Sequence, residues 1–265
     1  MKSPEPKKSI TSRLKLGMLA SLLFIIVGSA SAQNGTRETV NQSIGWLSLN
    51  SNMKLHSKFG ISLDVQIRQA GTDAMQRQVT AGFDYFVTKS LTIIPLGLSH
   101  VWNYQYGKQP AAFVNDENRI FQSIAYKHKI SRIAVSHRFK VEERFLQVHT
   151  KGASDEVIDN GYTNKQVRFR YRAMFNIPIN HDKMGPKTVY LSIWDEIFMS
   201  RGKSVTFNAP DQNRIFVGLG YQVTKDFSFQ GGYFLQTLIK SNGTKQENNA
   251  GIYLQMNYNF DFSKK

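Results

Sequence analysis

A strict alternation of apolar and polar residues is the feature that most constrains the fold of this chain. Between Phe59 and Arg68 every second residue is aliphatic or aromatic, and the residues between them are glycine or polar. Successive side chains of a β-strand point to opposite faces. The segment is therefore predicted to be a strand with one apolar and one polar face.

The same period returns along the chain. We identify eleven such segments, many of them longer than the ~9–11 residues that a tilted strand needs to cross the hydrocarbon layer of a membrane. They cover residues 42–55, 59–68, 78–85, 91–106, 119–127, 133–145, 166–175, 187–200, 214–223, 226–240 and 252–262. Few windows show the recurrence of an amphipathic helix.

The connections favour a membrane barrel. Those after the first, third, fifth and ninth segments are short, whereas 107–116, 147–163, 200–211 and 241–247 are long and polar. Short turns at one end and long loops at the other are typical of transmembrane antiparallel barrels, whose strand number is even in single-chain bacterial examples. We therefore predict an all-β, transmembrane, antiparallel up-and-down β-barrel of about 12 strands. The additional strand is expected between Thr36 and Asn50.

A period of two does not itself show which face is inside, and a soluble lipocalin-like barrel is the alternative. The polar phase holds many arginines among Gly, Ser and Gln, which is more typical of a water-filled lumen than of a soluble surface. The predicted lumen-lining residues are Arg68, Arg119, Arg138, Lys140, Glu142, Arg144, Arg168, Arg170, Arg172, Glu196 and Arg214. Lys127, Asp64, Asp84 and Glu117 share this phase. Arginine–carboxylate ladders that hold the wall together and a positive field that attracts anions are both consistent with this face.

The first 32 residues are predicted to be a cleaved secretory signal peptide. Five basic residues and Glu5 precede an apolar run at 16–27, and Ala30-Ser31-Ala32 forms a small-x-small cleavage site. Residues 33–265 are then one barrel domain, located in the bacterial outer membrane. The last segment ends in aromatic residues, as strands read by the barrel-assembly machinery commonly do, although two lysines follow.

Motifs for catalysis or cofactor binding are not found. The chain has no Cys, no phosphate-binding loop and no dinucleotide fingerprint, and its six His are scattered. Ser99-His100 and Ser136-His137 are adjacent on strands, so the two members of each pair should face opposite sides. We assign no catalytic residue, no metal site and no cofactor. Glu143 falls in the apolar phase, where an interfacial position at a strand end is expected.

Several motifs together make the chain similar to a family of predicted outer-membrane barrels from Gram-negative bacteria, domain of unknown function 2490. The resemblance implies an envelope β-barrel across nearly the whole mature chain and implies no activity. The motifs are Trp46 before a strand ending in Arg68, Glu117-Asn118-Arg119 with Gln122, Arg138, Glu142-Glu143-Arg144-Phe145, Arg168 to Arg172, Glu196, and Gln212-Asn213-Arg214 before Gly218, Leu219 and Tyr221.

Three functions fit these features. The first is a narrow or partly plugged channel that prefers anions. The others are a lipid-modifying hydrolase and a structural or binding barrel without transport. The expected partners are outer-membrane lipids and lipopolysaccharide, the barrel-assembly machinery and small anionic solutes. Nucleic acid is not expected, because the leader and the alternating strands place the basic residues in the envelope.

Overall fold

The structure is a computed structural model that describes residues 37–205, 210–241 and 243–263. The predicted signal peptide, residues 1–32, lies outside the described residues. In the described part of the chain, no helix is long and apolar enough to cross a membrane.

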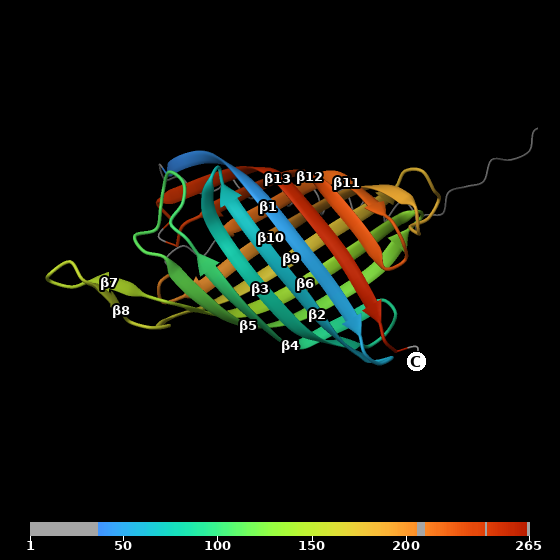
Figure 1. Cartoon of the computed structure of the whole chain (residues 1–265), viewed down its shortest axis with the longest axis horizontal. Helices are drawn as coiled ribbons and strands as arrows, with labels where there is room; N and C mark the ends of the chain where they lie inside the picture. The colour runs from blue at the N-terminus through green and yellow to red at the C-terminus, as the bar shows by residue number, and fades with distance from the viewer. Residues whose placement is uncertain (1–36, 206–209, 242, 264–265) are drawn as a thin grey trace, which may run out of the picture. The chain divides into compact units, whose positions relative to one another are not determined.

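Eleven long strands form one closed barrel in the described part of the chain (Figure 1). They are β1 (Glu38–Lys54), β2 (Phe59–Ala70), β3 (Asp73–Phe86), β4 (Leu91–Asn103), β5 (Asn115–Ile130), β6 (Ile133–Leu146), β9 (Asn164–Pro178), β10 (Thr188–Gly202), β11 (Gln212–Gln222), β12 (Phe227–Ile239) and β13 (Lys245–Asp261). Around the barrel they follow the chain order, and β13 closes on β1. The predicted all-β transmembrane barrel is therefore confirmed.

The closure between β1 and β13 is parallel, whereas all other neighbouring strands are antiparallel. This follows from the odd number of strands, because strands that alternate in direction leave the first and the eleventh pointing the same way. Each of the eleven predicted segments corresponds to one barrel strand. The barrel therefore has one strand fewer than twelve, in agreement with the prediction of about 12. Within the range Thr36–Asn50, residues 38–50 belong to β1 and add no separate strand.

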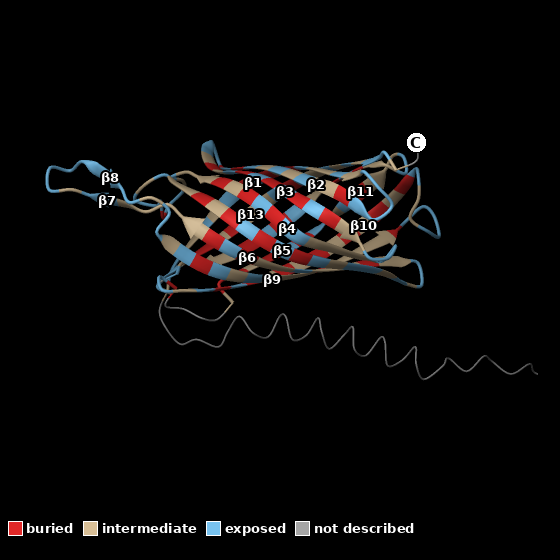
Figure 2. Cartoon of the chain, turned by 90° about the horizontal axis from the view of Figure 1, so that it is seen from below, coloured by how far each residue is buried: buried red, intermediate tan, exposed pale blue. Residues whose placement is uncertain are grey.

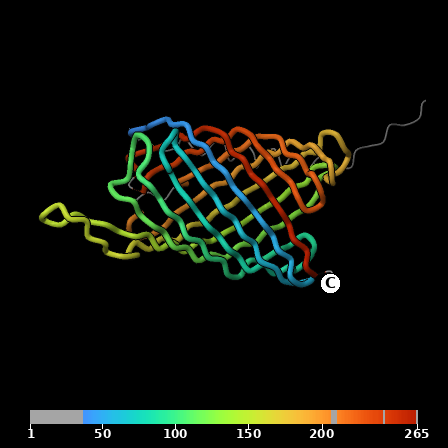
Figure 3. The backbone as a smooth tube through the Cα atoms, viewed as in Figure 1, coloured from blue at the N-terminus to red at the C-terminus, as the bar shows by residue number. Residues whose placement is uncertain are grey.

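The two ends of the barrel differ in their connections. Residues 55–58, 87–90, 131–132, 179–187 and 223–226 join strands at one end, here called the turn end. Residues 71–72, 104–114, 147–163, 203–211 and 240–244 join them at the other, the loop end. The loop 147–163 carries a small hairpin of β7 (His149–Lys151) and β8 (Val157–Asp159), which extends away from the barrel (Figure 3). The tight turn at 71–72 places Gly71 at a φ of 60°, a conformation that glycine adopts without steric cost.

Burial in this barrel is the reverse of that in a soluble protein. Phe139 and Leu219 are 55% and 57% exposed on the outer wall, whereas Glu117 and Arg68 are 1% and 4% exposed inside. Exposed and buried residues alternate along the strands, as Figure 2 shows. An apolar outer wall is stable against lipid and costs free energy in water. The soluble lipocalin-like alternative is therefore excluded.

Glycines make room inside the barrel for large inward-facing side chains. A Cβ atom on Gly97 would overlap the ring of Phe121, and one on Gly220 would overlap the ring of Tyr190. Both rings are buried, at 2% and 3% exposure. Glycine at these two positions thus leaves the space that the two rings occupy.

Candidate functional site

The lumen contains a cavity of about 700 Å³. Its lining includes Asn52 and Ser228 near the turn end and Tyr106 and Lys240 near the loop end, so the cavity extends along the barrel. Among the described residues, eleven Lys or Arg side chains line it, against four Asp or Glu side chains. The lining of the cavity is therefore largely polar and strongly cationic.

The structure places all eleven predicted lumen residues on the inward side of the wall. Ten line the cavity, namely Arg68, Arg119, Arg138, Lys140, Arg144, Arg168, Arg170, Arg172, Glu196 and Arg214. Glu142 is 2% exposed and accepts a hydrogen bond from Arg170 Nη1 at 2.7 Å. The face predicted from the phase of the alternation is thus one continuous inner surface.

A first cluster is centred on Glu117 of β5. Its Oε1 accepts from Arg119 Nε at 2.7 Å, and its Oε2 accepts from Arg119 Nη2 at 3.1 Å and from Arg144 Nη2 at 2.9 Å. Arg144 Nε also donates to Oε1. All three side chains are less than a tenth exposed. Two bidentate guanidinium contacts on one buried carboxylate make this cluster a structural cross-link between β5 and β6.

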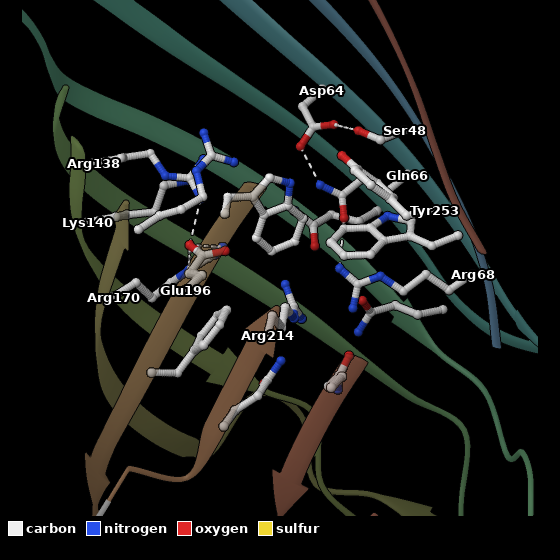
Figure 4. Close-up of a pocket in the computed structure, with 18 of the residues that line it drawn as sticks. Ser48, Asp64, Gln66, Arg68, Arg138, Lys140, Arg170, Glu196, Arg214 and Tyr253 are labelled. Atoms are coloured by element: carbon white, nitrogen blue, oxygen red, sulfur yellow. Dashed lines mark hydrogen bonds and ion pairs between the residues drawn. The ribbon is translucent and has the colours of Figure 1, made fainter. Parts of the chain in front are cut away.

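A second cluster joins β6, β9 and β10 through Glu196 (Figure 4). Glu196 Oε1 accepts from Arg138 Nη2 at 2.6 Å and from Arg170 Nη2 at 2.9 Å. Arg170 bridges Glu196 to Glu142, and Lys140 Nζ lies 3.9 Å from Glu142 Oε1. Arg138 and Glu196 are separated by a whole strand in the barrel order. These contacts hold three consecutive strands of the wall together.

Two further carboxylates take part that the sequence analysis did not assign. Asp211 lies in the loop before β11, and its Oδ2 is 3.4 Å from Arg168 Nη2. Glu247 of β13 is fully buried, with Lys240 Nζ 2.5 Å from its Oε1. Asp211 lies in an irregular connection and Glu247 lies just after one. At such positions the alternation does not indicate which way a side chain points.

Three arginines differ from the others. Arg68, Arg172 and Arg214 have no carboxylate within 4.0 Å in the part of the chain that the structure describes. Arg68 Nη2 donates instead to Gln66 Oε1 at 2.8 Å, and Arg214 lies against the side-chain amide of Gln212. Arg172 and Arg214 both flank Glu196 in the strand register, but the ion pairs of Glu196 go to other arginines. With Lys127, these three arginines are the cavity-lining cations of the described residues that form no ion pair.

An aromatic cluster occupies another sector of the inner wall. Its members are less than a tenth exposed and come from β1 and β10 to β13: Trp46, Trp194, Phe216, Phe234 and Tyr253. The guanidinium carbon of Arg68 lies 4.0 Å from the centre of the Trp46 ring, and that of Arg214 lies 5.1 Å from it. The sequence analysis did not predict this cluster. The signal was present, because Phe216 and Tyr253 fall in the polar phase of their strands.

The loop 104–114 lies at the loop end beside the start of β1 (Figure 3). Tyr106 Oη donates to Glu247 Oε2 at 2.8 Å, and Gln109 Nε2 donates to the carbonyl of Glu38 at 3.1 Å. Burial, together with the charge of Glu247, raises the pKa of Tyr106 above its ordinary value. Tyr106 also lines the cavity, so this loop contributes to its lining at the loop end.

The Ser–His pairs considered for hydrolysis are separated by the barrel wall. Ser99 is buried inside and bonded to Thr80 Oγ1, whereas His100 contacts Asn118 and Trp102. Ser136 lines the cavity, and His137 contacts the Tyr171 hydroxyl. Glu143 is exposed three residues before the end of β6. Among the described residues, no group of three or more His, Asp or Glu side chains is arranged to hold a metal ion.

Comparisons with known proteins give a family and two structural neighbours. The model of a family described as "Protein of unknown function (DUF2490)" matches residues 44–248. No curated protein matches the chain. Among solved structures, the NanC porin is 10% identical with a TM-score of 0.43, and the match covers 77% of this chain and 93% of that chain. The siderophore receptor PirA from Pseudomonas aeruginosa is 9% identical with a TM-score of 0.31, over 70% of this chain and 32% of that chain.

Proposed function

Because the chain belongs to the DUF2490 family of proteins of unknown function, we propose a function from the geometry of the lumen itself. The protein is an outer-membrane barrel that forms a narrow passage for small anionic solutes. The observation that carries this proposal is the cationic lining of the cavity, with eleven basic and four acidic side chains among the described residues.

The outer membrane is the membrane that suits such a barrel. Closed transmembrane barrels with short turns at one end and long loops at the other belong to that membrane, and the predicted signal peptide would export the chain. The loop end then faces the cell exterior, because the longer loops of such barrels are extracellular. The outer wall of the barrel contacts lipid and lipopolysaccharide. Tyr258 and Phe260 lie near the end of the last strand and Phe262 follows it, and the assembly machinery would read this end of the chain.

Anion preference follows from the division of the arginines. Those bound to Glu117, Glu142, Glu196 and Asp211 are partly neutralised by these carboxylates and hold the wall together. Arg68, Arg172 and Arg214 keep their charge without a carboxylate partner. A charge in a low-dielectric wall without a counter-ion is unfavourable, so a mobile anion in the lumen is stabilised there and a cation is repelled.

The test is the reversal potential of the refolded protein in a planar bilayer across a tenfold salt gradient. Anion preference should fall in each of three single variants, Arg68→Gln, Arg172→Gln and Arg214→Gln, because each removes one positive charge that has no carboxylate partner. Arg77→Gln is the matched control, since Arg77 is exposed on β3 outside the cavity lining. Equal anion preference in all four variants and the native chain would refute the assignment. Each variant must first show the same change in electrophoretic mobility on heating as the native chain, as a control for folding.

A further inference from the structure

Several hydrogen-bond donors inside the lumen have no partner in the described part of the chain, and two of them are neighbours. They are Arg68 Nε and Trp46 Nε1. Their side chains are 4% and 6% exposed, and the two residues are direct register neighbours on β2 and β1. A buried donor without an acceptor costs free energy, so the arrangement is suited to an acceptor that arrives with a ligand.

The neighbouring guanidinium groups are held in place by an indole ring. Arg68 and Arg214 both pack against Trp46, with their guanidinium carbons 4.0 and 5.1 Å from its centre. Figure 4 shows the two side chains reaching into the same part of the lumen. A guanidinium group stacked on a ring keeps its N–H groups in its own plane, directed outward from the edge. Such an edge matches the two oxygens of a carboxylate, and little side-chain entropy is lost on binding.

The surroundings of these donors are aromatic. Trp194, Tyr253 and Phe198 line the cavity as well. The rings of Trp46 and Tyr253 are 4.5 Å apart, and Arg214 lies 4.6 Å from the centre of Phe198. A small inorganic anion would meet only the charge, whereas the body of an organic acid would also contact rings.

We propose that Trp46, Arg68 and Arg214 form a binding site for the carboxylate of organic acids that carry a ring. The carboxylate accepts from Arg68 Nε, Trp46 Nε1 and Arg214 Nη1, the nitrogen of Arg214 that does not contact Gln212, while the ring packs among the aromatic side chains. The inference deepens the proposed function and rests on it, because the ligand must enter the cationic lumen as an anion.

The experiment is calorimetric titration of the refolded full-length mature protein in detergent with benzoate, acetate and chloride. We expect saturable benzoate binding that is at least tenfold tighter than that of acetate or chloride. Arg68→Gln and Arg214→Gln should each weaken benzoate binding about tenfold or more, because each removes a charged donor. Trp46→Phe keeps a ring but removes Nε1, and should weaken it less. Arg77→Gln is the control and should bind as the native chain does.

The outcomes separate this inference from the proposed function. Absent benzoate binding, or acetate and chloride binding as tightly, overturns the inference, even if bilayer recordings show anion preference. Benzoate binding that all three lumen variants retain also overturns it. Benzoate binding that is lost in these variants, in a protein without anion-selective conductance, supports the site and overturns the pore.

Discussion

The substitution Glu117→Gln tests whether the buried ladder holds the barrel together. Glu117 accepts four hydrogen bonds from Arg119 and Arg144 and is 1% exposed. The amide of Gln offers one acceptor oxygen and turns its NH₂ group toward the remaining donors, which leaves two buried guanidinium groups without a counter-charge. Removing one partner of a buried ion pair costs about 3–5 kcal/mol. Loss of about two hydrogen bonds to a charged acceptor, at roughly 1.5–3 kcal/mol each, gives a similar value.

The assay is urea unfolding of the refolded protein in lipid vesicles, followed by tryptophan fluorescence. We expect the free energy of unfolding to fall by about 3–5 kcal/mol in Glu117→Gln. Asp155→Asn is the control, because Asp155 pairs with Lys151 on the exposed hairpin and should contribute nothing measurable. A loss below about 1 kcal/mol in Glu117→Gln, comparable to that of a surface pair, would refute the ladder as a structural element.

Three further predictions concern the outer wall and the loop end. Leu254→Arg places a charge on the lipid side near the middle of β13, and should lower the free energy of unfolding in vesicles by about 2–4 kcal/mol, whereas native-like stability would contradict the outward orientation. Tyr106→Phe removes the hydrogen bond to Glu247, so single-channel conductance or its noise should increase; an unchanged trace would show that loop 104–114 does not narrow the passage. Because burial raises the pKa of Tyr106, the stability of this contact is complete below the ordinary tyrosine pKa of ~10 and is lost only as the pH rises through the raised value. Conductance should therefore stay constant from about pH 7 to 9, and a change in that range that is absent in Tyr106→Phe would contradict this.

The strands and their faces were predictable from the sequence because a period of two determines the orientation of every side chain once one face is assigned. The run from Arg168 to Arg172 illustrates this, since its three arginines all face the lumen. The alternation also separated Ser99 from His100. Local pattern is sufficient for such predictions because it depends only on neighbours within one strand.

The closure of the barrel was less predictable. The segments numbered eleven, and the even strand number of bacterial barrels favoured twelve. The parallel pairing of β1 with β13 joins Glu38 to Lys245 and depends on the whole circumference. No local pattern within either strand encodes its partner.

The division of the site into paired and unpaired arginines also required the structure. Arg138 and Glu196 meet across an intervening strand, and Asp211 reaches Arg168 from a loop. The phase of Arg172 is the same as that of Arg170, but only Arg170 forms ion pairs among the described residues. Which cations form ion pairs therefore depends on how far side chains reach between strands and from loops, which spacing along a strand does not specify.

The most direct test of the account is the charge selectivity of the lumen for a thiol reagent. The chain has no Cys, so Asn50→Cys introduces a single thiol at a position that lines the cavity. Its rates of modification by an anionic and a cationic methanethiosulfonate of similar size are measured in vesicles, each normalised to the rate with a free thiol in solution. The account predicts that the anionic reagent reacts faster, and that Leu254→Cys on the outer wall reacts with neither. Faster modification of the Asn50→Cys thiol by the cationic reagent, or equal normalised rates, would contradict a lumen built to admit anions.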